Sequence, residues 1–188
     1  MHHGYDGYDE PPRPVGVVPL DGRGSLPFAL IHGESLVAAA SWALGEAGVD
    51  LLDFTTTWSQ VQERGVALVV HDPLCPGTPV EFLRSAAAAA GEGRVVVGVR
   101  PVTDTVKHVD GDRLGDTVER AGLRAVASPV VLPAAVVAVL AEAPRLDDLA
   151  DLVVTLAAEH EIHEIEAPPL ARRVVDESDL RLVEGLSG

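Results

Sequence analysis

Apolar residues along the chain follow two alternating patterns, short continuous runs and helical stripes. Continuous runs at 15–20, 66–72 and 94–102 predict strands that are covered on both faces, because such strands lose the polar alternation of a half-exposed strand. Segments 33–48 and 78–93 carry apolar residues at helical spacing and predict helices. The order of strand, helix and strand predicts a right-handed parallel crossover. The pattern therefore predicts an α/β fold with helices packed on a mostly parallel sheet.

The start of the second helix carries a capping signal. Thr78 is followed by Pro79, and Glu81 stands three residues after the threonine. A threonine with an acidic or amide residue at this spacing forms a capping box, and proline is favoured in the first helical turn. We therefore expect Thr78 to cap this helix.

The middle of the chain contains less regular segments. Residues 50–57 predict a strand, and residues 58–65 a short helix or turn. In 103–129, two extended segments flank Asp-Gly-Asp, which favours a tight hairpin. We expect a β-arm over about 103–127, and because an isolated hairpin is barely stable in water, this arm needs a surface to lie on.

The last third of the chain predicts further helices and one charged strand. Helices are expected over 133–143, 146–159 and 176–186, and the strand over 160–167.

Length and composition limit the architecture. The chain has 188 residues, which fits a single domain, placed at 15–188 after a disordered tail at 1–14 that is rich in Gly, Tyr, Asp, Pro and His. Hydrophobic residues make up 47% of the chain and aromatic residues only 4%, so the core is expected to consist mostly of Ala, Val and Leu.

Charge argues against two classes of partner. Fourteen basic and 29 acidic residues give a formal net charge of -15, which repels nucleic acids and anionic membrane surfaces. The least polar stretch, 125–144, is interrupted by Pro129 and Pro133 and closed by Glu142, so no membrane span is expected. A single cysteine allows no internal disulfide, and residues 1–14 lack the pattern of a signal peptide, so a cytoplasmic location is expected.

Asp72 and Cys75 stand in a turn after the buried strand. The carboxyl end of a strand is where α/β folds bind ligands, so Asp72 is either a metal ligand or a cap for the turn, and the cap is the favoured reading. Cys75 has no basic partner assigned to it, which favours a plain small residue over a nucleophile. Arg23, between Gly22 and Gly24, marks either an anion site or, as we favour, a surface turn.

Two pairs of histidines invite a metal interpretation. His160 and His163 lie three residues apart on a predicted strand and would point to opposite faces, which favours a solvated edge strand. His2 and His3 lie in the predicted tail and make a poor metal site.

Four fragments, 66–76, 99–114, 117–129 and 169–186, resemble in the same order the 2-C-methyl-D-erythritol 4-phosphate cytidylyltransferases of isoprenoid precursor synthesis. The likeness covers about 66–186 and extends more loosely over 15–44. It implies a three-layer, nucleotide-diphospho-sugar-transferase-like (Rossmann-like) α/β fold with a mostly parallel sheet and a projecting β-arm. It also implies a homodimer built through that arm, and Mg²⁺ that assists attack of the substrate phosphate on the α-phosphorus of CTP.

The resemblance assigns roles to residues that match the family's pattern. Asp72 matches the metal-associated acid, and Arg173 keeps a positive charge in the place of a lysine. Thr105 and Arg120 match arm residues that hold the substrate phosphate of the partner subunit. Alternatively, Thr105 is an ordinary strand residue and Arg120 is an exposed arginine that forms only surface ion pairs.

The nucleotide side departs from the family's pattern. Gly22, Arg23 and Gly24 remain of the Gly-rich loop that binds nucleotide phosphates, but Asp21 adds a negative charge and Phe28 replaces a lysine.

Further family positions are lost elsewhere in the chain. Cys75 replaces a substrate-binding arginine, and Pro168 replaces a second metal acid. Segment 50–65 is too short for the part that reads the cytosine and ribose.

These losses predict weak or absent catalysis, because phosphoryl-type transfer depends on positioned charge. The leading interpretation is a shortened, degenerate family member, a pseudoenzyme with a binding, regulatory or dimer-scaffold role. It would act as a homodimer, or as a mixed dimer with an authentic cytidylyltransferase. The alternative is an active, divergent, Mg²⁺-dependent cytidylyltransferase. Mg²⁺ is expected only in that case.

Overall fold

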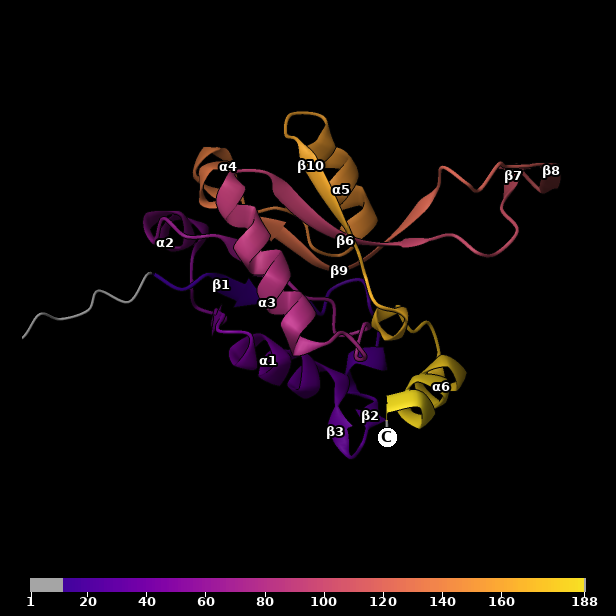
Figure 1. Ribbon diagram of the computed structural model, residues 1–188, viewed down its shortest axis with the longest axis horizontal. Helices are drawn as coiled ribbons and strands as arrows, with labels where there is room; N and C mark the ends of the chain where they lie inside the picture. Colours follow the sequence, from indigo (N-terminus) through magenta and orange to yellow (C-terminus); the bar gives the residue numbers. More distant parts are fainter. Residues whose placement is uncertain (1–11, 188) are drawn as a thin grey trace, which may run out of the picture.

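A six-stranded sheet runs through the middle of the protein in the computed structural model, which describes residues 12–187 (Figure 1). Within those residues five strands are parallel and β9 alone runs the opposite way. From one edge to the other, the strands are β10 (Ile162–Glu166), β6 (Val95–Pro101), β9 (Arg124–Leu132), β5 (Leu68–Val70), β1 (Val15–Val17) and β4 (Asp50–Leu51). The predicted α/β fold with a mostly parallel sheet is confirmed.

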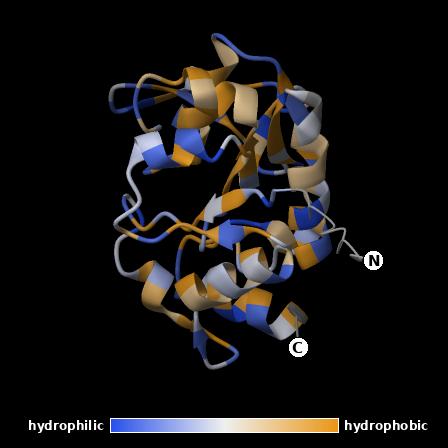
Figure 2. Cartoon of the chain, turned by 90° about the vertical axis from the view of Figure 1, so that its left-hand side faces the viewer, coloured by the Kyte–Doolittle hydropathy of each residue, from blue (hydrophilic) through white to orange (hydrophobic). Residues whose placement is uncertain are grey.

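Helices cover both faces of this sheet. On one face lie α2 (Trp58–Glu63), α4 (Ala134–Val139) and α5 (Leu149–Ala157), and on the other α1 (Leu36–Glu46) and α3 (Val80–Ala89). Side chains alternate along each strand and so contribute to the cores on both faces. In Figure 2 the strands at the centre of the molecule are coloured mostly as hydrophobic. In β5, for example, Leu68 and Val70 pack on the first face and Val69 on the second. The result is the expected three-layer fold.

A smaller cluster packs beside the sheet. It joins α6 (Glu177–Ser187) to the hairpin of β2 (Leu30–Ile31) and β3 (Glu34–Ser35). Its buried residues are Ile31, Leu36, Leu74, Val174, Leu180 and Val183. Short 3₁₀ turns occur at Leu26–Phe28, Ala90–Glu92 and Pro169–Ala171. The hairpin was not predicted, because two-residue strands carry too little pattern.

The arm projects from the body as a separate two-stranded sheet (Figure 1). Strand β7 (Lys107–Asp110) pairs with β8 (Arg113–Thr117), and every residue of both strands is exposed. Val109 and Leu114 pair across the strands and remain 69% and 73% exposed. The arm therefore carries apolar side chains that its own chain does not bury.

Several expected boundaries differ from the structure. The capping box at Thr78 is wrong: Pro79 is the N-cap of α3, and the Thr78 hydroxyl donates to the Cys75 carbonyl at 2.8 Å. Predicted strand 50–57 is reduced to β4, while 58–65 contains α2.

The predicted tail is described only in part. Residues 1–11, with His2 and His3, lie outside the described part. The Pro14 carbonyl accepts from the Asp50 amide at 2.9 Å, so the fold begins before residue 15. Across 12–187, no helix has the length and apolar character needed to cross a membrane.

Candidate functional site

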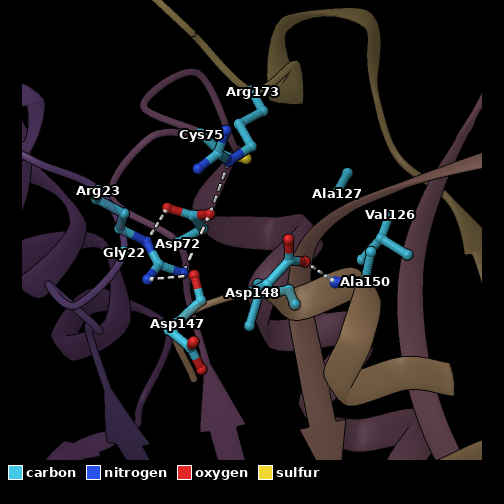
Figure 3. A pocket seen from close by; sticks show the side chains of 11 residues that line it. Gly22, Arg23, Asp72, Cys75, Val126, Ala127, Asp147, Asp148, Ala150 and Arg173 are labelled. Atoms are coloured by element: carbon cyan, nitrogen blue, oxygen red, sulfur yellow. Dashed lines mark hydrogen bonds and ion pairs between the residues drawn. The ribbon is translucent and has the colours of Figure 1, made fainter. Parts of the chain in front are cut away.

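Segments distant in sequence meet at the carboxyl ends of β1 and β5, around a cavity of about 330 Å³ (Figure 3). Gly22 and Arg23 come from the loop after β1, Asp72 from the turn after β5, and Arg173 from the segment before α6. The segment between α4 and α5 completes the wall. The fold therefore brings together four of the predicted site residues, at the sheet edge where α/β proteins bind ligands.

Asp72 is the centre of the charged contacts. Its Oδ1 accepts from Arg23 Nε at 2.8 Å and from the Leu74 amide at 2.9 Å. Its Oδ2 accepts from Arg23 Nη2 at 3.3 Å and from Arg173 Nε at 3.1 Å. Only 3% of Asp72 is exposed. One carboxylate thus binds two arginines and also closes the backbone turn, as the capping interpretation expects.

These contacts determine the charge of the carboxyl group. Burial acts to raise the pKa of Asp72, but the hydrogen bonds from Arg23 and the Leu74 amide, with the charges of Arg23 and Arg173, outweigh that effect. The pKa of Asp72 is lowered from its ordinary value, so the group is ionised at neutral pH.

Arg23 is buried, with 5% of the residue exposed, and its guanidinium binds the protein itself. Besides Asp72, it donates through Nη1 to the carbonyl of Asp21 at 2.6 Å and to that of Leu146 at 2.9 Å. These bonds tie the loop after β1 to the segment between α4 and α5 (Figure 3). The arginine therefore acts as a structural bridge across the site.

Gly22 makes the close approach of these two segments possible. It has a φ of +75°, and a Cβ built on it would lie 2.6 Å from the Asp147 carbonyl oxygen. Only glycine fits both the left-handed backbone and the contact. Gly24 also has a positive φ, of +58°, but has open space around it and does not line the cavity.

Two other polar groups beside Asp72 are buried and uncharged. Burial raises the pKa of the Cys75 thiol well above its ordinary value, and the Asp72 charge acts in the same direction. The thiol therefore stays protonated, which agrees with a plain packing role. Burial also lowers the pKa of His71 to about 4. The Ser128 hydroxyl accepts from the Asp72 amide at 2.9 Å and forms a second hydrogen bond, of 2.5 Å, with His71 Nδ1, whose direction depends on the tautomer of the neutral imidazole.

The arm residues lie away from the cavity of their own chain. Thr105 and Arg120 are exposed and line none of the hollows around Asp72, and Arg120 donates to the Thr103 carbonyl. Phe28 is also exposed, at 60%. The expected roles of Thr105 and Arg120 in binding the substrate phosphate remain predictions.

The donor set around Asp72 does not fit Mg²⁺. The four hydrogen bonds to the two carboxylate oxygens occupy the lone pairs that a metal would need, and two arginines stand where a cation would be repelled. The other acids that line the cavity are also engaged, since Asp147 pairs with Arg145 at 2.7 Å and Asp148 caps α5. Among residues 12–187, no group of three His, Cys, Asp or Glu side chains is placed to hold a metal ion.

The sheet topology shows where His160 and His163 lie. His163 lies on β10, an edge strand, and His160 precedes that strand. The predicted edge strand is confirmed, but the expectation that both histidines lie on it is wrong, because His160 precedes the strand.

Sequence reasoning missed the contribution of the segment between α4 and α5. Leu146 and Asp147 bind Arg23 through backbone carbonyls, which leave no signal in a residue pattern. Asp148 did leave one, because an acidic residue before an apolar helical stripe is an N-cap signal.

The fold is a three-layer α/β fold of the nucleotide-diphospho-sugar-transferase-like type. A solved 2-C-methyl-D-erythritol 4-phosphate cytidylyltransferase from Thermus thermophilus superposes with a TM-score of 0.63 at 22% identity, over 87% of this chain and 94% of that one. This likeness establishes the shared fold.

Sequence comparison gives the family relationship. A cytidylyltransferase of the same name from Nocardia farcinica is 37% identical over 122 residues, which are 63% of this chain and 52% of the relative. One from Corynebacterium efficiens is 33% identical over 101 residues, 53% of this chain and 36% of the relative. The alignments span about half the length of these curated relatives or less. No protein-family model matches the chain. The chain is a relative of the 2-C-methyl-D-erythritol 4-phosphate cytidylyltransferases, as its sequence fragments predict.

Proposed function

We propose that this chain is a catalytically impaired cytidylyltransferase-like protein, a pseudoenzyme that acts by binding, as a regulatory or scaffolding homodimer. One observation carries the proposal: Arg23, the cation expected to bind nucleotide phosphates, is buried and bound to Asp72 and to backbone carbonyls. A guanidinium engaged in this way offers few donors to a ligand. Breaking its bonds to the buried Asp72 would leave a carboxylate without its main partner.

Three further features support the proposal. The donor set at Asp72 does not suit Mg²⁺, Phe28 replaces the lysine of the family's pattern, and residues 50–65 are too few for the segment that reads the base. Transfer of a nucleotidyl group depends on charges placed around the phosphates, and each missing group commonly costs about 3 kcal/mol of transition-state stabilisation.

The homodimer is proposed from the arm. Val109 and Leu114 form an exposed apolar pair on a hairpin that has little to pack against in its own chain. A second copy of the chain would supply that surface and would bring Thr105 and Arg120 near the partner's site. The same arm in a mixed dimer would complete the site of an authentic cytidylyltransferase.

Isothermal titration calorimetry with CTP and Mg²⁺ tests the loss of nucleotide binding. We expect no saturable heat up to about 1 mM CTP, whereas an authentic cytidylyltransferase measured in parallel binds. Binding with a Kd near 1 µM, or repeated release of pyrophosphate by the purified chain, would overturn the proposal.

An active, divergent, Mg²⁺-dependent cytidylyltransferase is the second candidate. The convergence of Gly22, Arg23, Asp72 and Arg173 on one cavity favours it. It requires Arg23 or Arg173 to leave Asp72 when the nucleotide binds, so CTP would protect the chain against unfolding only in the presence of Mg²⁺.

Co-expression tests the mixed dimer. A tagged copy of this chain is expected to retain an untagged authentic cytidylyltransferase of the same cell through an affinity step. If the two proteins elute separately while each forms its own dimer, the mixed dimer is excluded.

A further inference from the structure

A hollow of about 480 Å³, which we call the α5 hollow, lies between α5 and the segment that joins it to α4. Its apolar lining residues are Leu140, Pro144, Leu152, Val154 and Leu156. The Leu140 carbonyl accepts from Trp58 Nε1 at 3.2 Å and from Gln62 Nε2 at 3.0 Å, and both donors belong to α2. Two hydrogen bonds to a neighbouring helix therefore fix one wall of the α5 hollow.

Four carboxylates line the α5 hollow, against one guanidinium. They belong to Glu142, Asp147, Asp148 and Asp151, and the guanidinium belongs to Arg145. Arg145 pairs with Asp147 at 2.7 Å, and one oxygen of Asp148 accepts from the first amides of α5. Glu142 and Asp151 are exposed, and among residues 12–187 their side chains have no hydrogen bond or ion pair. Two carboxylates are therefore available to a positively charged partner.

The apolar lining also extends to surface that the chain does not cover. Leu152 and Leu156 are buried and pack on the sheet, but Val154 remains 72% exposed. An apolar lining with free carboxylates around it suits a segment whose residues alternate between apolar and basic at helical spacing. The apolar side chains would enter the hollow, and the basic ones would reach the carboxylates.

The charge and the elements that line the α5 hollow select the kind of partner. Residues 1–11 of the chain contain three acidic residues and no Lys or Arg, and a second copy of the chain carries a net charge of -15, so both are repelled. No strand lines the hollow, which excludes the addition of a β-strand. A helix laid along a groove is the mode of recognition that remains.

We propose that the α5 hollow is a docking site for a basic amphipathic helix of a partner protein, with Glu142 and Asp151 as the main charged contacts and Val154 at the apolar edge. A helix bound there would contact the same segment whose Leu146 carbonyl accepts from Arg23, so docking is connected to the Asp72 cavity. The inference goes beyond the proposed function, because it requires neither dimerisation through the arm nor any property of nucleotide binding.

Fluorescence anisotropy with a labelled synthetic peptide tests the site. The probe is a peptide of leucine and lysine, about four helical turns long, with leucine at helical spacing. At about 0.15 M NaCl, long-range attraction between a basic peptide and an acidic protein is largely screened. The parent chain is expected to bind the probe saturably, and at least about tenfold more tightly than a peptide of the same composition in scrambled order, because only the probe has an apolar face.

Substitutions separate the α5 hollow from the rest of the acidic surface. Glu142→Lys and Asp151→Lys are each expected to weaken binding about fivefold, because a repulsion replaces an attraction. Glu159→Lys is the matched control, since Glu159 is an exposed acid just beyond α5 that does not line the hollow, and its replacement changes the net charge by the same amount. Val154→Ser is expected to weaken binding about threefold. Val139→Ser is its control, because Val139 is similarly exposed on α4 but lies outside the lining, and it is expected to bind like the parent.

Three results would overturn the proposal: absence of saturable binding up to about 1 mM probe, equal binding of the probe and the scrambled peptide, or losses in the control variants as large as those in the hollow. All five variants replace exposed side chains, so they are expected to keep the parent's circular dichroism and unfolding midpoint within a few degrees. A chain that fails to bind CTP, or that stays monomeric, still presents the α5 hollow, so those outcomes leave this test unaffected.

Discussion

At the scale of single residues, substitution of Asp72 shows whether its carboxylate serves in a structural ion pair or as a metal ligand. Its carboxylate neutralises the buried Arg23, so Asp72→Asn would leave that guanidinium charged and without an anionic partner. Loss of one member of a buried pair typically costs about 3–5 kcal/mol. We expect urea unfolding to show a loss of at least about 3 kcal/mol for Asp72→Asn.

Asp116→Asn on the arm is the control for that substitution. Asp116 is exposed on β8, so its replacement is expected to change the free energy of unfolding by less than about 0.5 kcal/mol. A metal ligand held apart from structural contacts would behave differently: Asp72→Asn would then leave stability nearly unchanged.

His71 gives the molecule a pH dependence of known sign. Burial lowers its pKa to about 4 in the folded state, against an ordinary value of 6.5. Between these values the unfolded chain binds a proton that the folded chain does not, so stability falls as the pH decreases from about 6.5 to 4. The loss attributable to His71 is roughly 3 kcal/mol.

Substitution separates this effect from that of the carboxylates. His71→Gln retains a side chain that can hydrogen-bond with the Ser128 hydroxyl but does not titrate, so the slope of unfolding free energy against pH between about 5 and 6.5 is expected to decrease. His108→Gln on the exposed β7 is expected to keep the parent's slope. An unchanged slope in His71→Gln would show that His71 binds its proton equally well in both states. The lowered pKa of Asp72 acts in a different window, since its stabilisation is lost only as the pH falls below the ordinary aspartate range.

At the scale of elements, the sequence predicted those helices and strands whose apolar residues repeat at a single period over many positions and pack against the core. Strand β6 and helices α1 and α5 were predictable because apolar residues repeat at one period over many positions. The cap at Thr78 was not, because two prolines, a glycine and the threonine in residues 76–79 also fit a turn, and the hydroxyl closes that turn instead.

The site was predictable in its residues but not in its contacts. Gly22, Arg23, Asp72 and Arg173, which the family resemblance assigns to phosphate and metal binding, line one cavity. The favoured interpretation of Arg23 as part of a surface turn is wrong, because its side chain is buried against Asp72. That Arg23 binds the carbonyl of Leu146, more than 100 residues away, follows only from the three-dimensional arrangement.

The contact between the loop after β1 and the segment between α4 and α5 can be tested with two glycines. Both Gly22 and Gly24 have positive φ, but only a Cβ on Gly22 would collide with Asp147. Gly24→Ala is expected to lose about 1 kcal/mol for the backbone alone. Gly22→Ala should lose about 1–3 kcal/mol more and make residues 140–148 more sensitive to limited proteolysis. Equal losses in the two variants would show that the contact contributes nothing.

At the scale of the whole molecule, the exposed arm is the feature that most needs a partner. Val109→Lys with Leu114→Glu replaces the apolar cross-strand pair by an opposite-charge pair, so the hairpin keeps a favourable contact while its apolar surface is lost. We expect this double variant to sediment as a monomer and the parent chain as a dimer, with core stability unchanged.

The net charge of the chain predicts a salt dependence for the same self-association. Two copies carrying -15 each repel one another, so an apolar contact has to overcome electrostatic repulsion that salt weakens. The parent's self-association is therefore expected to strengthen between about 0.05 M and 0.5 M NaCl, over which the Debye length falls severalfold. Val154→Lys on α5, also an exposed apolar residue, is the control and is expected to stay dimeric. A parent chain that remains monomeric at high salt, or a double variant that still dimerises, would contradict assembly through the arm.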